Sequence, residues 1–439
     1  AGIGKSRLVR ELLKVAHENG FKVFTGNCQS YGGAIPYLPW KEITQDLLDI
    51  GRFDTRKERI RKVSDNLSAC NKELENWAPV IGELLGLNIP ENELTKNIDA
   101  KLRRERMFDI ILELIEWRAK TSPVVLVLED LHWIDFGSIE LLNYIGRNIE
   151  DKPVLILLVA REFHTTMEIM DKPYYSELKL KELQKNDISL LVKSLLKVKE
   201  LPTELDKLIR EKTQGNPLFV EELVKILLER NIIKIRNKNC LISEELNTVE
   251  IPDRIQEVIM ARVDKLSQSA REVLQVASVI GHEFEYQTLE GVFPFRIDLR
   301  DQLNLLERLD IVVFEEREGK LKYSFKHILT QEVVYETIAY SKRRELHNKI
   351  AHFIETRFKD ILDEYLGILS YHYYHAHNWE SAFYYSLEAA ERAKNIYANE
   401  EALKFYDRAL ETFNRLCKQG YHKKLFEYLK STDAATIQK

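Results

Sequence analysis

The amino end of the chain carries the second half of a phosphate-binding loop. Residues 1–6, AGIGKS, match the end of the pattern G-x-x-x-x-G-K-[ST], and residues 7–14 continue with the composition of a helix. In such a loop the backbone N–H groups surround the phosphates, Lys5 reaches the β and γ oxygens, and the Ser6 hydroxyl is a ligand of Mg²⁺. The residues expected to contact a nucleotide are Gly2, Ile3, Gly4, Lys5, Ser6 and Arg7.

Part of this loop is expected upstream of the sequence. The first glycine of the pattern and the strand that normally carries the loop would lie before Ala1, and the chain has no initiator Met. We therefore expect a fragment of a longer protein. Since the phosphate cradle and the sheet centre would be incomplete, this polypeptide alone is expected to bind ATP poorly or to fold incompletely.

Length and charge limit the class of protein. A chain of 439 residues exceeds one ordinary core and suggests about three or four domains. A formal net charge of -5 argues against general attraction to nucleic acid or anionic lipid. The longest apolar run, Pro123 to Leu128, is far too short to span a membrane.

The cysteines indicate a reducing compartment. They form no C-x-x-C pair and lie far apart, at Cys28, Cys70, Cys240 and Cys417. This is the usage expected where thiols stay reduced. We therefore expect a cytoplasmic protein without a membrane segment in this stretch.

Short apolar strands alternate with helices in the first part of the chain. The predicted strands are residues 21–25, 124–128 and 154–160, and a helix is expected over residues 138–148. A long charged region, residues 40–120, is predicted to be helical with breaks near Gly51 and Pro90. This alternation favours an α/β fold with a parallel sheet, which we assign to residues 1–180 as a truncated P-loop domain lacking its first strand.

The rest of the chain is mainly helical. Helices predicted over residues 186–196, 205–213 and 220–229 suggest a helical lid across residues 181–248. Between residues 249 and 341, three helical stretches precede strands at 311–315 and 321–325, separated by the turn residues Glu318 and Gly319. Helices followed by a small hairpin indicate a winged helix.

Small residues repeat near the carboxyl end. Residues 342–439 read as helices in which alanines recur seven positions apart, at Ala382 and Ala389 and again at Ala402 and Ala409. This spacing lets antiparallel helices pack closely, as in helical-repeat proteins. We predict the start of an array of tetratricopeptide-like repeats.

Two acidic residues follow the most apolar strand. Glu129 and Asp130 come directly after residues 124–128, where a nucleotide-hydrolysing protein needs a Mg²⁺ carboxylate and a group that orients water. By position Glu129 would hold Mg²⁺ and Asp130 would polarise the attacking water, although the two roles could be reversed. A helix start is the other reading of two adjacent acids.

An arginine ends the next predicted strand. Arg161 lies where the end of a parallel strand meets the ligand crevice, so its guanidinium could sense a γ-phosphate. The alternative is a surface arginine paired with Glu162.

These motifs together resemble one known module. The segments that carry the resemblance are AGIGKSRLVREL, YGGAIPYLP, LVLEDLHWID, LLVARE, GNPLFVEEL and YSFKHILTQEVVYETI. They look like the STAND-type AAA-like ATPase module of bacterial signalling proteins, which is often downstream of a class III adenylate/guanylate cyclase domain. The resemblance covers nearly the whole chain.

The family resemblance carries expectations about function. It implies an ATPase core, a helical lid, a winged helix and tetratricopeptide-like repeats that work as an ATP/ADP switch with Mg²⁺. Pro217 would pack near the adenine. His327 resembles the histidine that senses the ADP phosphates in related switches, with a structural histidine as the alternative.

We therefore expect a slow regulatory ATPase that controls a fused effector, preferably a cyclase making cyclic nucleotide. The repeats would bind a protein partner, and no direct nucleic-acid contact is expected in this fragment. One alternative is a transcription regulator with a DNA-binding domain elsewhere. Another is a scaffold in which the nucleotide is structural.

Three charged or imidazole clusters receive plainer interpretations. His372, His375 and His377 lie among tyrosines and are assigned to a repeat helix, and not to a metal site. The basic residues Lys342, Arg343 and Arg344 are assigned to a solvated helix start, and not to phosphate binding. An exposed helix face, and not an arginine finger, is expected for Arg103, Arg104 and Arg106.

Overall fold

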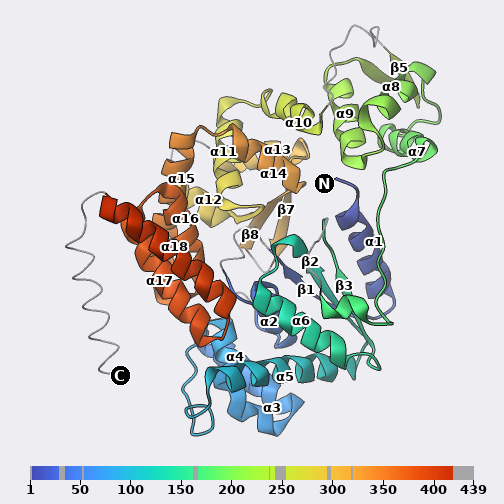
Figure 1. The fold of residues 1–439 in the computed structure, drawn as a ribbon. Coiled ribbons are helices and arrows are strands. Elements are labelled where there is room, and N and C mark those ends of the chain that lie inside the picture. The colour runs from blue at the N-terminus through green and yellow to red at the C-terminus, as the bar shows by residue number, and fades with distance from the viewer. Residues whose placement is uncertain are drawn as a thin grey trace. The chain divides into compact units, whose positions relative to one another are not determined.

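The computed structural model describes residues 2–28, 35–51, 54–161, 167–236, 238–242, 254–293, 298–317 and 320–418 (Figure 1). The chain divides into two compact units. The first unit combines Ala1–Leu12 with Glu177–Lys342, and the second unit combines Leu13–Ser176 with Arg343–Lys439. Helix α1 (Lys5–Glu18) and helix α15 (Tyr340–Arg357) each cross from one unit into the other.

A parallel sheet forms the centre of the second unit. Its strands are β1 (Lys22–Asn27), β2 (Val124–Glu129) and β3 (Val154–Leu158), in the order β1-β2-β3. Residues 124–128 are at most 1% exposed, because β2 has a neighbour on each side and helices cover its faces. The three predicted strands and the parallel arrangement are confirmed.

Helices fill the long connection between β1 and β2. They are α2 (Leu38–Leu47), α3 (Arg56–Cys70), the 3-10 helix Lys72–Trp77, α4 (Ala78–Leu85) and α5 (Ala100–Ala119), while α6 (Phe136–Asn148) follows β2. The expected breaks near Gly51 and Pro90 are present, and two further breaks separate α3 from α4. Residues 31–34, the first part of the motif YGGAIPYLP, lie outside the described residues.

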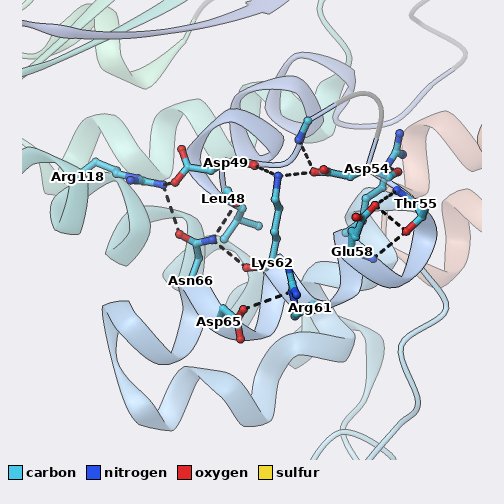
Figure 2. Close-up of polar contacts among 12 residues, drawn as sticks. Leu48, Asp49, Asp54, Thr55, Glu58, Arg61, Lys62, Asp65, Asn66 and Arg118 are labelled. Atoms are coloured by element: carbon cyan, nitrogen blue, oxygen red, sulfur yellow. Dashed lines mark hydrogen bonds and ion pairs between the residues drawn. The ribbon is translucent and has the colours of Figure 1, made fainter. Parts of the chain in front are cut away.

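A polar network fixes the break at Gly51, as Figure 2 shows. Lys62 of α3 donates to the backbone carbonyl of Asp49 at 2.8 Å and to Asp54 at 2.6 Å. Arg118 of α5 reaches Asp49 at 2.6 Å. Because these charges belong to different helices, the network holds α3 and α5 against the end of α2.

Three helices and a hairpin lie between residues 185 and 242 of the first unit. The helices α7 (Lys185–Leu196), α8 (Thr203–Thr213) and α9 (Pro217–Glu229) match the predicted ones. They share a buried aliphatic core. The hairpin β4 (Ile233–Arg236) and β5 (Asn239–Ile242) was not predicted, because strands of four residues are too short to show a clear alternation.

Residues 254–337 combine helices with a small antiparallel sheet. The elements are α10 (Ile255–Val263), α11 (Gln268–Ile280), β6 (Glu283–Glu285), α12 (Tyr286–Val292), α13 (Leu299–Arg308), β7 (Val312–Arg317), β8 (Lys320–Phe325) and α14 (Ile328–Thr337). The sheet order is β6-β8-β7. The two expected strands are present, a fourth helix and β6 were missed, and the predicted turn Glu318 and Gly319 lies outside the described residues.

Consecutive helices pack side by side at the carboxyl end of the second unit. After α15 come the 3-10 helix Lys359–Tyr365, α16 (Leu366–Ala376), α17 (Trp379–Asn395) and α18 (Asn399–Lys418), which stack in sequence order (Figure 1). The four alanines that repeat seven apart are all at most 4% exposed. The predicted fold class, an α/β P-loop fold followed by helical parts and helical repeats, is confirmed.

Within the described residues, no helix has both the length and the apolar composition needed to cross a membrane.

Candidate functional site

The phosphate-binding loop turns directly into α1. Gly2 and Gly4 have φ angles of 75° and 99°, which glycine adopts without a steric penalty. The carbonyl of Gly4 accepts a hydrogen bond from the N–H of Leu8 at 3.0 Å, and Lys5 is the first residue of the helix. A Cβ built on Gly4 would meet no atom within 4 Å. The helix terminus and this open space suit a phosphate group.

The Arg7 side chain, just after the loop, is exposed on α1. Arg7, predicted to contact nucleotide, is 72% exposed and pairs with Glu11 at 3.1 Å along the helix. Such an exposed pair contributes little to stability, so the arginine remains available to a ligand.

The start of α9 packs against the same loop, within the first unit. The carbonyl of Gly2 accepts a hydrogen bond from the N–H of Leu218 at 3.2 Å. A Cβ on Gly2 would lie 2.6 Å from the Cβ of Leu218 and 3.0 Å from the side-chain oxygen of Asn216. Asn216 caps α9 by accepting from the N–H of Phe219 at 3.1 Å. Pro217, predicted to lie near the adenine, is therefore the first residue of the helix that touches the phosphate loop.

The acidic residues lie at the carboxyl end of β2, within the second unit. Glu129 is the last residue of the strand, and its carbonyl accepts a hydrogen bond from the N–H of Cys28 at 3.0 Å. Asp130 follows in the left-handed region, with φ of 56°. This conformation leads the chain into a short 3-10 helix, Leu131–Trp133. The predicted position of both acids at a strand end is present.

Arg161 lies near the loop that follows the acids. It comes shortly after β3, and its guanidinium is 5.9 Å from the centre of the Trp133 ring. A cation at this distance from an indole face is attracted to it. The structure therefore brings Arg161 to the segment that Glu129 and Asp130 begin, while Glu162 lies outside the described residues.

His327 precedes α14 in the first unit. Burial, and next the positive charge of Lys326, lower the pKa of its imidazole to about 4. Its Nε2 atom has no hydrogen-bond partner in the described part of the protein. The imidazole is therefore neutral at neutral pH and holds a polar atom that a further group could satisfy.

A buried ion-pair cluster joins α9 to the elements around His327. Glu222 of α9 is 3% exposed and binds the guanidinium of Arg262 in α10. Lys225, one turn further along α9, reaches Glu222 at 3.2 Å and Asp310 at 2.5 Å, and Lys326 also binds Asp310. This cluster was not predicted from the sequence. Its only local signal is a glutamate pair within an apolar helix, GNPLFVEEL.

The prediction of an exposed face for three arginines of α5 is wrong. Their side chains are 13%, 17% and 23% exposed for Arg103, Arg104 and Arg106. Arg103 binds Glu83 at 2.5 Å and Glu91 at 2.8 Å. Arg104 binds Glu140 of α6 at 2.6 Å. The acidic partners of Arg103 and Arg104 come from other segments, so the sequence around these two arginines did not reveal the pairing, while Arg106 pairs with Asp109 and Glu113 within α5.

The histidines near the carboxyl end pack between repeat helices. The Nδ1 atoms of His347 in α15 and His372 in α16 are 2.8 Å apart, and the ring of His375 stacks on that of His347. Among described residues, no group of three His, Cys, Asp or Glu is arranged to hold a metal ion.

In the predicted basic helix start, Arg344 is exposed and donates to the carbonyl of Ala376 at 3.4 Å.

Family models match two parts of the chain. Residues 1–157 match the AAA ATPase domain, and residues 185–241 match a family described as a domain of unknown function (DUF8739).

Curated relatives are longer than this chain. An uncharacterized protein of Rhizobium meliloti (strain 1021) is 24% identical over 437 residues, 98% of this chain and 41% of that protein. Adenylate cyclase type 10 of Oryctolagus cuniculus is 19% identical over 338 residues, 67% of this chain and 21% of that protein. Hybrid signal transduction histidine kinase G of Dictyostelium discoideum is 25% identical over 160 residues, 36% of this chain and 4% of that protein. The chain thus spans less than half the length of these relatives.

A solved structure is also similar. It is a STAND protein with a tetratricopeptide repeat sensor from Pyrococcus horikoshii, at 14% identity and a TM-score of 0.46, over 98% of this chain and 64% of that one. Residues 1–157 thus match the AAA ATPase domain, and the P-loop, strand-end acid and GNPLF motifs of the chain resemble those of STAND-type ATPase modules.

Proposed function

We propose that the chain is an ATP-binding, slowly hydrolysing signalling switch that regulates a fused effector domain. The observation that carries this proposal is the contact between Gly2 and Leu218. It joins the phosphate loop to the first turn of α9, and the next turns of α9 are tied to α10 by the pair of Glu222 and Arg262. A change at the loop would therefore reach the predicted winged helix through one rigid element.

The proposed roles follow the motifs. Mg²⁺-ATP would be held by Lys5 and Ser6, with Glu129 on the metal and Asp130 orienting water; the bound metal would neutralise charge on the phosphates. Arg161 would stabilise the γ-phosphate.

Two further residues would respond to the nucleotide. Pro217 would pack near the adenine, because it begins the helix that touches the loop. His327 would offer its unsatisfied Nε2 to the phosphates of ADP. A structural role remains the alternative for this histidine.

The proposed effector is an adenylate or guanylate cyclase outside this chain, and the repeats would bind a protein partner. Support comes from the names of two relatives, the adenylate cyclases type 10 of Oryctolagus cuniculus and Rattus norvegicus. A DNA-binding effector is the alternative. Cyclase activity of the parent protein that depends on the ATPase motifs would support the cyclase effector. Specific DNA binding that weakens strongly with salt would support the DNA-binding effector.

The test of the switch is ATP titration by calorimetry on the parent protein. Lys5→Ala is expected to lower ATP affinity at least tenfold, because a buried phosphate loses its cation. Arg10→Ala, an exposed charge on the same helix, is the matched control and should leave affinity unchanged. Equal affinity in the Lys5 variant and the parent would overturn the P-loop assignment. If the parent protein binds ATP but releases no phosphate, that result would support the alternative of a scaffold in which the nucleotide is structural.

A further inference from the structure

The acidic loop, residues 130–135 after β2, is held at its start by backbone contacts. The N–H of Cys28, at the end of β1, donates to the carbonyl of Glu129 at 3.0 Å. The N–H of Leu131 donates to the carbonyl of Val159, just after β3, at 3.0 Å. These bonds extend the ladders of the parallel sheet, so the loop begins at a fixed point between two neighbouring strands.

A side chain holds the other end of the acidic loop. Asp135 is 2% exposed, and its carboxylate accepts hydrogen bonds from neutral donors only. The N–H of Tyr37 donates to Oδ1 at 3.2 Å, the N–H of Ser138 donates to Oδ1 at 2.8 Å, and the Ser138 hydroxyl donates to Oδ2 at 2.6 Å. Because Tyr37 lies 98 positions before Asp135, this carboxylate joins the start of α2 to the start of α6.

Close packing surrounds this carboxylate. Tyr37 is fully buried and has a φ of 56°. A Cβ on Gly137 would lie 2.7 Å from the Cζ atom of the Tyr37 ring. The indole N–H of Trp40 donates to the carbonyl of Ser138 at 3.0 Å. The start of α2 and the first turn of α6 therefore fit each other in one arrangement, which excludes water from Asp135.

The contact with Tyr37 exceeds what a helix cap needs. A cap takes one side-chain oxygen that accepts from an N–H in the first turn, and serine does this about as well as aspartate. Asp135 fills that role through Ser138 and also binds Tyr37. A buried carboxylate is costly unless its donors stay in place. Since these donors come from two segments, the buried charge keeps both segments together.

Asp130 lies inside the anchored loop in a conformation that needs support. Its φ of 56° is in the left-handed region, which is unfavourable for a residue with a Cβ. The N–H of Trp133 donates to its carbonyl at 3.0 Å and closes the turn. Its side chain is 37% exposed, so the carboxylate can meet water while the backbone is held. Such a backbone persists only where the surrounding structure holds it, so release of the loop at Asp135 would let Asp130 relax.

We propose that Asp135 is a positioning residue for ATP hydrolysis: by binding Tyr37 and the first turn of α6 together, it fixes the acidic loop, so that Asp130 keeps its left-handed backbone and its carboxylate keeps one position. This role rests on the proposed hydrolytic function, in which Asp130 orients the attacking water. A displacement of about 1 Å in such a group can slow a reaction about a hundredfold. The anchor therefore acts on the rate of hydrolysis, while the affinity for ATP depends on Lys5 and Ser6.

The first test is Asp135→Ser in the parent protein. Serine still caps α6, but its side chain is one bond shorter and does not reach Tyr37. We expect phosphate release in a single turnover to fall about a hundredfold, with ATP affinity by calorimetry unchanged within about twofold. Asp99→Ala is the matched control, because Asp99 caps α5 in the same unit by accepting from the N–H of Leu102 at 2.8 Å. A normal rate of phosphate release in Asp135→Ser would reduce Asp135 to an ordinary cap and overturn the proposal.

A second variant keeps the test decisive if Asp135→Ser fails to fold. Gly137→Ala leaves Asp135 and its cap in place, but the new methyl collides with the buried ring of Tyr37 and pushes it from the carboxylate. Phosphate release should fall as far as in the serine variant. An unchanged rate in Gly137→Ala would show that the contact with Tyr37 has no part in hydrolysis.

Amide hydrogen exchange without nucleotide separates positioning from general stability. In Asp135→Ser, exchange at residues 131–134 should become about tenfold faster, while residues 125–127 of β2 stay protected. Equally faster exchange in β2 would make Asp135 a structural residue and overturn the proposal. If the parent protein releases no phosphate but exchange at residues 131–134 becomes faster in the variant, the loop anchor is supported and the proposed hydrolysis is overturned. Unchanged exchange there, in a parent protein that hydrolyses ATP, overturns the anchor alone.

Discussion

The backbone carbonyl of Gly2 accepts a hydrogen bond of 3.2 Å from the backbone N–H of Leu218. This bond joins the loop at the start of the chain to the first turn of α9. The glycine has no room for a side chain, because a Cβ would lie 2.6 Å from that of Leu218. Loop and helix therefore move together as long as this contact persists.

Gly2→Ala should separate the loop from α9. The new methyl collides with Leu218, and the φ of 75° adds strain of about 1 to 2 kcal/mol. We expect ATP affinity, measured by calorimetry on the parent protein, to fall roughly tenfold. Gly20→Ala is the control, since it has a φ of 77° but no atom within 4 Å of the added Cβ. Similar affinities in the two variants would contradict a role for the contact.

Glu222→Ala should destabilise the first unit strongly. It removes the carboxylate bound to the buried guanidinium of Arg262 and leaves the longer contact with Glu229 at 3.6 Å, a loss of about 3 to 5 kcal/mol by analogy with other buried pairs. Denaturant unfolding measures this loss. The double variant Glu222→Leu with Arg262→Met should recover much of it, because both charges are then absent. No recovery would mean that the pair does not act as a unit.

Acid should loosen the packing of α15 against α16. Burial is the main reason that the pKa of His372 falls to about 3, and His347 is lowered by burial, then by His372, His375 and Arg343. The folded state therefore binds fewer protons than the unfolded state, whose histidines titrate near pH 6.5. Their contribution to stability is complete above pH 6.5 and is lost progressively as the pH falls toward 3.

This pH dependence can be measured by denaturant unfolding at several pH values. His347→Leu combined with His372→Leu should reduce the slope of the profile between pH 6.5 and 4, because the two imidazoles that are at most 2% exposed are then absent. His352→Gln is the control, since that side chain is 72% exposed. An unchanged slope in the double variant would assign the effect to other groups.

Arg161→Ala should separate ATP binding from hydrolysis. The guanidinium is expected to act on the γ-phosphate, so phosphate release from the parent protein should fall about a hundredfold with ADP affinity unchanged. Arg161→Lys should restore little of the rate of phosphate release, because the ammonium group of lysine lacks the planar pair of N–H donors of a guanidinium. Arg147→Ala, whose side chain is 48% exposed, provides the control. A normal rate of phosphate release in the Arg161 variant would make that arginine structural.

Local patterns in the sequence predicted the elements that each segment forms by itself. The glycines and Lys5 indicated the phosphate loop, the run at residues 124–128 indicated the central strand with Glu129 at its end, and the spaced alanines indicated close helix packing. These patterns succeed because backbone conformation and strand burial depend on neighbouring residues. Short strands such as β4 and β5 were not predicted, since four residues show too little alternation of apolar and polar side chains.

Only the tertiary structure decided which charges meet. Arg103, Glu222 and Glu401 look like ordinary surface residues in sequence, yet each is largely buried against a partner from another segment. A charge has no preference for a partner until packing removes water from around it, and that depends on segments far apart in the chain. The sequence therefore determined the phosphate loop and the strand-end acids, and the tertiary structure decided that α9 contacts the loop at Gly2 and that α18 contacts the start of α6.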